Sequence, residues 1–204
     1  RCTGKLQSGS YRIDGGISSQ FITGLLFATS LIDGHSELTV TGNIESKPYI
    51  EMTKQAMALF QAPHYRSPGT VTVEGDWSNG AFWIAAQFLE NEIWVTGLDN
   101  TSSQGDRAVV DLIPNMKTQS TTIDASDIPD LVPILSVVAA SNHGATFTNI
   151  QRLRLKESDR VASTVAMLEA LGGKAEATED TLTVYGAGYR GGTVNSAGDH
   201  RIAM

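Results

Sequence analysis

One repeat of the chain reads TIDASDIPDLVPILSVVAASNHGATFTNI, residues 122–150, and its pattern decides the fold. A strand pattern at 122–124 precedes an apolar helix pattern at 131–140, and a second strand pattern covers 145–150. An amphipathic helix is predicted from Asp159 to Leu171, where Gly172 and Gly173 end it. Because a helix that is apolar on most sides is typical of a buried element, the repeat predicts a βαβα unit around a shared core.

The same order of elements occurs in two earlier copies and begins once more near the end of the chain. The first copy has strand patterns at 11–14 and 38–42 and helix patterns at 21–31 and 48–60. The second copy has strand patterns at 71–74 and 93–97 and helix patterns at 81–89 and 106–116. The fourth copy starts with a strand pattern at 193–195, and a further strand at 181–185 follows the third copy alone. We therefore predict an α/β fold of repeated units with a domain boundary near Glu74 and Gly75.

Composition and charge limit the possible classes of protein. A chain of 204 residues can bury a core, and its net charge of −7 argues against a nucleic-acid partner, since phosphate backbones require a basic face. The longest apolar run, at 21–32, is shorter than the roughly 20 residues of a membrane span, so no membrane partner is predicted. The one cysteine, Cys2, excludes an internal disulfide and favours a reducing compartment. Arg1 is not an initiator methionine, so we expect the natural N-terminus to lie upstream.

Two predicted helix starts in the first repeat could bind an anion. Ser18-Ser19-Gln20 follows a glycine pair, and Ser46-Lys47-Pro48-Tyr49 places proline in the first helical turn. Hydroxyl groups and unpaired backbone N–H groups at such positions form an anion site. The alternative is plain N-capping beside a surface lysine, and the residues alone leave both interpretations open.

The third and fourth repeats carry the densest charge. Lys156 and Arg160 are four residues apart, so one helical turn would direct both to the same point, with Glu157 beside them for proton transfer. Asp130 lies at the start of an apolar helix, where it is either a cap or a proton acceptor. Asp199-His200-Arg201 begins another helix. The alternative for the Lys156 region is a solvated ladder of charges. No metal-ligand spacing occurs among the four histidines and one cysteine.

These motifs together resemble the 5-enolpyruvylshikimate-3-phosphate synthase family. The matching stretches, in chain order, are GISSQFITGLL (16–26), SKPYIE (46–51), EGDWS (74–78), QGDR (104–107), IPD (128–130), RLKESDR (154–160) and DHRIAM (199–204). No single motif identifies the family, but the ordered set covers nearly the whole chain. KESDR and DHRIAM are the most specific of the set.

The resemblance implies an inside-out α/β barrel of repeated βαβαββ units in two domains that close over substrate. Residues 1–74 would then belong to the lobe that contacts shikimate 3-phosphate, and residues 75–204 to the lobe with the catalytic residues. The implied reaction transfers the enolpyruvyl group of phosphoenolpyruvate to the 5-hydroxyl of shikimate 3-phosphate, through a tetrahedral intermediate, and releases phosphate. No metal or other cofactor is implied. A cytoplasmic monomer of the shikimate pathway is expected, with glyphosate competing at the phosphoenolpyruvate site.

The resemblance also implies roles for individual residues. Shikimate 3-phosphate is expected at Ser18, Ser19, Gln20 and Ser46, with Tyr49 near its ring. Asp130 matches the catalytic base for the 5-hydroxyl, Lys156 binds in the same region, and Glu157 matches the acid that exchanges protons with the enolpyruvyl methylene. Arg160 and Arg201 match the clamps for phosphoenolpyruvate, with His200 beside them.

Several family features are absent from the chain. The family's early Lys-Ser pair, a phosphoenolpyruvate-binding arginine and a late C-terminal lysine have no match here, and Arg152 stands where many members carry asparagine. We therefore expect the chain alone to be inactive or nearly so, although the longer parent protein would be active. Two alternatives stay open. One is the sister enolpyruvyl transferase that acts on UDP-N-acetylglucosamine and uses a loop cysteine, a role for which Cys2 is poorly placed. The other is a binding module that keeps only the fold.

Overall fold

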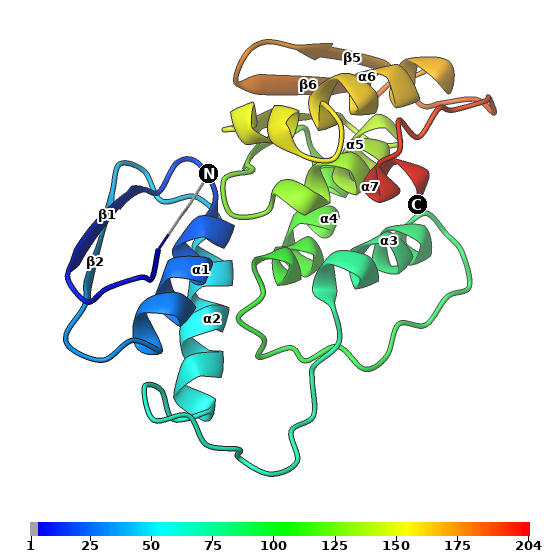
Figure 1. The fold of residues 1–204 in the computed structure, drawn as a ribbon. Helices are drawn as coiled ribbons and strands as arrows, with labels where there is room; N and C mark the ends of the chain where they lie inside the picture. Colours follow the sequence, from blue (N-terminus) through cyan, green and yellow to red (C-terminus); the bar gives the residue numbers. More distant parts are fainter. Residues whose placement is uncertain (1–3) are drawn as a thin grey trace. The chain divides into compact units, whose positions relative to one another are not determined.

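A computed structural model describes residues 4–204 of the chain (Figure 1). The chain divides into two compact units, Arg1–Val73 and Glu74–Met204. Cys2, on which the expected redox compartment rests, lies outside the described residues. Among the residues that the structure describes, every helix is too short or too polar to cross a lipid bilayer.

Unit 1, the segment Arg1–Val73, has the βαβα order that its sequence predicts. Its elements are β1 (Ser10–Asp14), α1 (Ser19–Ser30), β2 (Glu37–Thr41) and α2 (Lys47–Leu59). The two strands pair in parallel, with Ser10 opposite Glu37 and Asp14 opposite Thr41. The helices pack against each other, and the hydroxyls of Thr23 and Thr53 are 2.9 Å apart at their contact.

The turn after β1 requires glycine at its first position. A Cβ atom on Gly15 would lie 2.9 Å from the side chain of Val40 and 3.0 Å from that of Ile44, closer than carbon atoms normally approach. The backbone N–H of Gly15 donates to the carbonyl of Thr41 at the end of β2. The connections that follow the two strands therefore touch. Because the strands are parallel, α1 and α2 both begin at this edge of the sheet.

Unit 2, the segment Glu74–Met204, contains most of the helices and a four-stranded sheet. Its helices are α3 (Trp77–Phe88), α4 (Val109–Thr118), α5 (Val132–Ala140), α6 (Arg160–Ala170) and α7 (His200–Ala203), with 3-10 turns η1 (Gly105–Ala108), η2 (Pro129–Leu131) and η3 (Gln151–Leu155). Its strands are β3 (Thr121–Asp124), β4 (Ala145–Thr148), β5 (Lys174–Ala177) and β6 (Thr181–Tyr185). The strand order is β3-β4-β6-β5, in which only β3 and β4 are parallel.

Helix α5 forms the centre of unit 2. It contacts β4 and β6 of the sheet as well as α3, α4 and α6, and Figure 1 shows it between the sheet and α4. Eight of its nine residues are buried, because nearly every side chain from Val132 to Ala140 is apolar or small. Its one buried hydroxyl, on Ser136, donates to the carbonyl of Val132 one turn earlier, so no polar group is left unpaired there. The predicted buried helix at 131–140 is thus confirmed.

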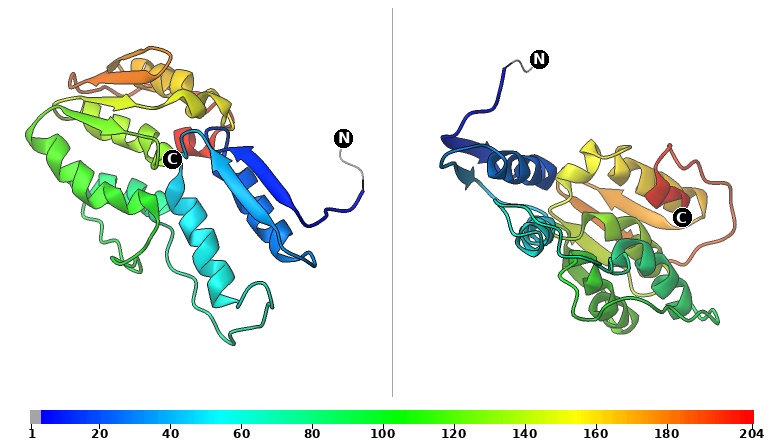
Figure 2. Two further views of the ribbon diagram at one scale, coloured as in Figure 1. Left: turned by 90° about the vertical axis from the view of Figure 1, so that its left-hand side faces the viewer. Right: turned by 60° about the horizontal axis from the view of Figure 1, so that its bottom comes forward.

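Three strands predicted from the sequence were wrong. Residues 71–74, 93–97 and 193–195 form no strand in the described part of the chain. A strand needs a neighbouring strand to take up its backbone hydrogen bonds, and these segments have none there. Two of their apolar side chains are strongly exposed, Val73 at 87% and Trp94 at 85%, whereas Val194 packs against the core without being part of a strand. The second repeat is therefore present as helices without strands, in the green part of the ribbon (Figure 2). Helices α3 and α4 contribute Trp77, Ala81 and Ile113 to the core.

Truncation of Leu135 tests the central position of α5. The side chain of Leu135 is fully buried, so Leu135→Ala should lower the free energy of unfolding of unit 2 by about 2–5 kcal/mol. Leu155→Ala is the matched control, because Leu155 is 80% exposed and should change stability by less than about 0.5 kcal/mol. Urea unfolding followed by circular dichroism measures both. Equal losses in the two variants would contradict the assignment of α5 as the core.

Candidate functional site

In unit 1 the predicted substrate-binding residues gather at the two helix starts. Ser18 caps α1, with its hydroxyl accepting a hydrogen bond from the N–H of Gln20 at 3.2 Å. Ser19 is buried, whereas Gln20 is exposed. The capping interpretation is therefore correct for Ser18. It does not exclude an anion at the same helix start, because further backbone N–H groups lie in the first turn.

The start of α2 has a different geometry. Ser46 is buried, has a left-handed backbone (φ 54°) and makes no capping hydrogen bond with the helix. Pro48 occupies the first turn, and the N–H of Tyr49 donates to the carbonyl of Ser46 at 3.1 Å. A non-glycine residue in the left-handed region is energetically costly, and such residues gather at functional sites. The capping interpretation was wrong for Ser46.

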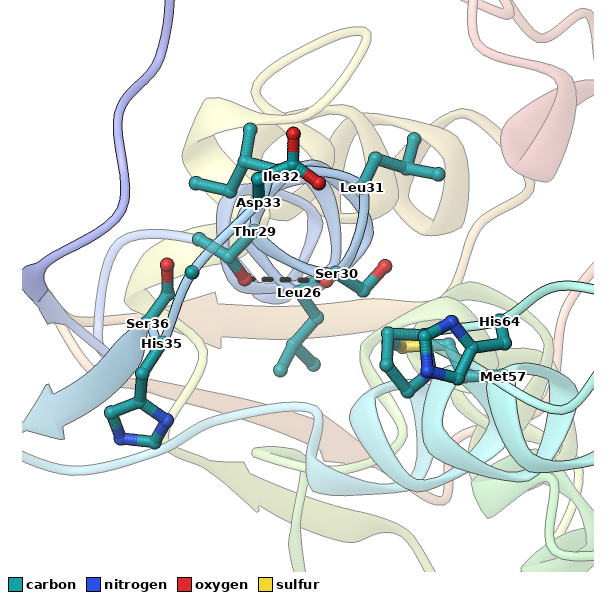
Figure 3. A pocket seen from close by; sticks show the side chains of 12 residues that line it. Leu26, Thr29, Ser30, Leu31, Ile32, Asp33, His35, Ser36, Met57 and His64 are labelled. Carbon is teal, nitrogen blue, oxygen red and sulfur yellow. Dashed lines mark hydrogen bonds between the residues drawn. The ribbon is translucent and has the colours of Figure 1, made fainter.

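A separate cavity of about 510 Å³ lies at the other end of α1. Figure 3 shows His35 and His64 on opposite sides of it, with Thr29 and Ser30 of the last helical turn between them. Because α1 has 12 residues, this end is roughly 18 Å from Ser18. The cavity is therefore distinct from the two helix starts that the sequence singles out.

Unit 2 brings five predicted site residues together from three separate segments. Asp130 lies on η2, which Pro129 begins and which directly precedes the buried helix α5. Lys156 and Glu157 occupy the turn between η3 and α6, and Arg160 is the first residue of α6. The fifth residue, Arg201, lies on α7. We refer to these five residues as the charged cluster.

Arg160 is the centre of the charged cluster. It is only 1% exposed, and its guanidinium donates to three carboxylates. Nη1 donates to Asp130 at 2.8 Å and Nη2 donates to Glu157 at 2.6 Å. Nε and Nη2 donate to Asp199 at 3.0 and 3.3 Å. A buried guanidinium is stable only when its donors are satisfied in this way.

Arg201 approaches Asp130 from the other side. Its Nη2 lies 3.3 Å from Oδ2 of Asp130 and also donates to the hydroxyl of Ser78, while Nη1 donates to Asn79 at 3.1 Å. Its guanidinium stands over the ring of Phe82 at 5.9 Å, a cation–π contact. The Nε atom is buried and has no hydrogen-bond partner among the described residues. One donor of the Arg201 guanidinium is therefore left unpaired inside the protein.

The other two members of the charged cluster are more accessible. Nζ of Lys156 is 3.8 Å from Asp130, and its side chain is about a quarter exposed. The side chain of Glu157 is 50% exposed, and that of Asp130 is 20% exposed. The open side of the charged cluster therefore presents two carboxylates and one ammonium group to an approaching ligand.

The cations keep the carboxylates ionised. Burial alone would raise the pKa of Asp130, but Lys156, Arg201 and Arg160 together hold that pKa below its usual value. Burial would likewise raise the pKa of Asp199, yet the hydrogen bonds from Arg160 and from the backbone of Arg201 hold it below its usual value. Burial opposes the charge of Arg160, and its bonds to the carboxylates raise its pKa nonetheless. Asp130 is therefore an ionised carboxylate near neutral pH, as a general base requires.

Some residues fall outside these expectations. His200, predicted beside the clamps, has a mostly exposed ring whose Nδ1 is 4.0 Å from Asp199. Asp199, Ser78 and Asn79 were not predicted as site residues, although they contact the two arginines. Asp199 precedes a helix and caps it by accepting from the N–H of Arg201, so its sequence signal is that of an ordinary cap. No group of residues in the described part of the chain could hold a metal ion.

Comparison with known proteins places the chain in a family. A family model described as EPSP synthase (3-phosphoshikimate 1-carboxyvinyltransferase) matches residues 2–204. The chain is 39% identical to a 3-phosphoshikimate 1-carboxyvinyltransferase of Clostridium kluyveri over 98% of its own length and 55% of that protein. It is 33% identical to the Brachyspira hyodysenteriae protein of the same name, over 100% of the chain and 57% of that protein.

The solved structures show the same fold. EPSP synthase from Acinetobacter baumannii superimposes with a TM-score of 0.68 at 19% identity, over 98% of this chain and 55% of that one. The mixed α/β fold is therefore shared. In all these comparisons the chain spans about half the length of the relatives.

Acid unfolding tests the charged cluster. Asp130 and Asp199 have lower pKa values folded than unfolded, so as the pH falls the unfolded chain takes up protons first. The stabilisation is complete above the unfolded pKa of about 4 and declines as the pH falls below it. Urea unfolding at intervals from pH 7 to pH 3 should show that the free energy of unfolding declines. The slope of this free energy against pH should be smaller in Asp130→Asn. An equal slope in this variant and the unchanged chain would contradict the ionised cluster.

Proposed function

Because the chain belongs to the EPSP synthase family, we propose that it takes part in transferring the enolpyruvyl group of phosphoenolpyruvate to the 5-hydroxyl of shikimate 3-phosphate, with release of phosphate. One observation carries the proposal: Asp130, Lys156, Glu157, Arg160 and Arg201 converge from three segments into one connected cluster. The product would serve aromatic amino-acid biosynthesis.

The cations of the charged cluster suit phosphoenolpyruvate. This substrate carries a carboxylate and a phosphate, and planar guanidinium groups bind such anions through paired hydrogen bonds. Arg160 would accept the ligand by giving up its contact with the half-exposed Glu157. We propose that glyphosate, an anion of similar size, competes for the same cations.

The carboxylates supply the proton transfers. In the proposed step the incoming ligand displaces Glu157 from Arg160, and Glu157 then takes a proton from solvent. Asp130 takes the proton from the 5-hydroxyl as the hydroxyl oxygen bonds to C2 of phosphoenolpyruvate, while Glu157 gives its proton to C3. In the resulting tetrahedral intermediate the C2–O bond to phosphate breaks as Glu157 takes a proton back from C3, which restores the double bond. The departing phosphate keeps the electron pair of that bond and takes up the proton that Asp130 holds, so Asp130 returns to its ionised form. Lys156, 3.8 Å from Asp130, would hold the attacking oxygen and stabilise negative charge there. No metal or other cofactor takes part in these steps.

Unit 1 would bind the second substrate. Ser18, Ser19 and Ser46 place hydroxyls at the starts of α1 and α2, on one edge of the two-stranded sheet. We propose that they bind the phosphate and hydroxyls of shikimate 3-phosphate, with Gln20 and Tyr49 beside its ring. His200 would complete the phosphoenolpyruvate side. In this proposal the two units are parts of the two lobes of an inside-out α/β barrel of βαβαββ repeats.

Phosphate release tests the reaction. The assay supplies phosphoenolpyruvate with either shikimate 3-phosphate or UDP-N-acetylglucosamine to this chain and to the longest natural protein that contains it. We expect release with shikimate 3-phosphate from the longer protein and little from the chain, which spans about half of its relatives. Asp130→Asn and Glu157→Gln should each lower kcat roughly 10²- to 10⁴-fold, the usual contribution of a general acid or base.

Two isosteric variants provide controls. Asp111→Asn and Glu169→Gln remove the same charges at exposed positions on α4 and α6, and should leave kcat within about twofold. Release only with UDP-N-acetylglucosamine would assign the protein to the sister transferase. If the longer protein released phosphate with neither acceptor, the family fold would be present without the chemistry, and the proposal would fail.

A further inference from the structure

Asp199 is a fully hydrogen-bonded carboxylate in unit 2, although no proposed catalytic step requires it. Its side chain is completely buried, and each of its oxygens accepts two hydrogen bonds. Oδ2 accepts from Nε of Arg160 at 3.0 Å and from the hydroxyl of Ser158 at 3.1 Å. Oδ1 accepts from Nη2 of Arg160 at 3.3 Å and from the backbone N–H of Arg201 at 2.9 Å. One carboxylate thus joins three positions of the chain.

The two bonds to Arg160 act as a bidentate pair. Nε and Nη2 lie on one edge of the guanidinium, and a carboxylate on that edge fixes both the plane and the rotation of the group. The remaining donor, Nη1, then points at Asp130 at 2.8 Å. Without Asp199, the buried Arg160 would have only Asp130 and Glu157 as carboxylate partners, and these are the two groups that the reaction needs.

The backbone bond acts on the second arginine. By accepting from the N–H of Arg201, Asp199 caps the short helix α7 and sets where the Arg201 side chain begins. That side chain reaches Oδ2 of Asp130, while Arg160 reaches Oδ1. The guanidinium groups of Arg160 and Arg201 therefore both contact the carboxylate of Asp130, and this arrangement depends on Asp199.

We infer that Asp199 is the positioning residue of the anion clamp, which holds Arg160 and Arg201 in place so that an incoming anion displaces Glu157 and not the buried contact. The inference rests on the proposed function, because it concerns how that site takes phosphoenolpyruvate. Asp199 touches neither substrate, and it acts through the two arginines. Its counterpart on the open side is Glu157, whose side chain is 50% exposed and can move aside.

Binding measurements test the role. Asp199→Asn should weaken phosphoenolpyruvate binding roughly ten- to a hundredfold, the loss expected when charged hydrogen bonds are removed, and leave shikimate 3-phosphate binding within about twofold. Calorimetry on the longest natural protein that contains the chain gives both dissociation constants. If Asp199 had a purely structural role, Asp199→Asn would weaken the binding of both ligands by a similar factor. An equal loss of affinity for the two ligands would therefore overturn the inference. An unchanged affinity for phosphoenolpyruvate would overturn it as well.

Asp159→Asn is the matched control. Asp159 is the neighbour of Arg160 in sequence and caps α6 through the N–H of Ala162, yet none of its hydrogen bonds goes to the Arg160 guanidinium. Asparagine also caps helices, and the lost ion pair with Arg154 is partly exposed, so binding should change by less than about twofold. A loss equal to that of Asp199→Asn would show that any carboxylate near α6 has the same effect, which contradicts the inference.

Ser158→Ala is a second test of the inference, for use if Asp199→Asn does not fold. It removes one of the four hydrogen bonds to Asp199 and keeps the charge. Phosphoenolpyruvate binding should weaken roughly two- to tenfold, in the same direction as in Asp199→Asn but by less. No weakening in Ser158→Ala would count against the inference.

A ligand-independent measurement separates this inference from the proposed function. In the ¹⁵N-labelled chain the Nε–H of Arg160 should give a slowly exchanging signal, assigned by its absence in Arg160→Lys. The signal should be lost or exchange rapidly in Asp199→Asn and persist in Asp159→Asn. Equal protection in Asp199→Asn and the unchanged chain would overturn the positioning role, whatever the ligand. A protected signal without any binding of phosphoenolpyruvate would instead overturn the proposed function and keep Asp199 as the partner that orders Arg160.

Discussion

The buried guanidinium of Arg160 is the constraint on which the rest of the site depends. A charge that is 1% exposed would be strongly destabilising unless several carboxylates were placed around it. Asp130, Glu157 and Asp199 satisfy this requirement from three segments of the chain. Replacing Arg160 would leave those carboxylates crowded together, while replacing any one of them would leave the guanidinium underpaired. The cluster is therefore formed as a whole.

The apolar centre of unit 2 gives this cluster its rigidity. Helix α5 is enclosed by the sheet and by α3, α4 and α6, and η2, which carries Asp130, directly precedes it. Arg160 begins α6, which packs against the same helix. The polar groups are thus fixed to elements that cannot shift without opening the core, and a well-packed interior resists such shifts.

The charges of the cluster balance. Three cations, Lys156, Arg160 and Arg201, face three carboxylates, Asp130, Glu157 and Asp199. Of the three carboxylates, Glu157 is the most exposed, so it is the one that an incoming anion would displace at least cost. The resident carboxylates also keep the cations ordered before a ligand arrives, which lowers the entropy lost on binding.

The sequence by itself determined the βαβα order of the first and third repeats, the buried helix at 131–140 and the family, because hydrophobic period and short motifs are local properties. It also predicted that Lys156 and Arg160 lie together, but the expected helical turn was wrong, because α6 begins only at Arg160 and Lys156 has an extended backbone. The two side chains meet instead through their shared contact with Asp130. Only the tertiary structure decided that residues 71–74, 93–97 and 193–195 are not strands, because a strand depends on a neighbour that its own sequence does not specify. The tertiary structure alone also revealed that Asp199 pairs with Arg160, which lies 39 residues earlier in the sequence. A buried carboxylate and a helix cap have the same local sequence, and packing alone distinguishes them.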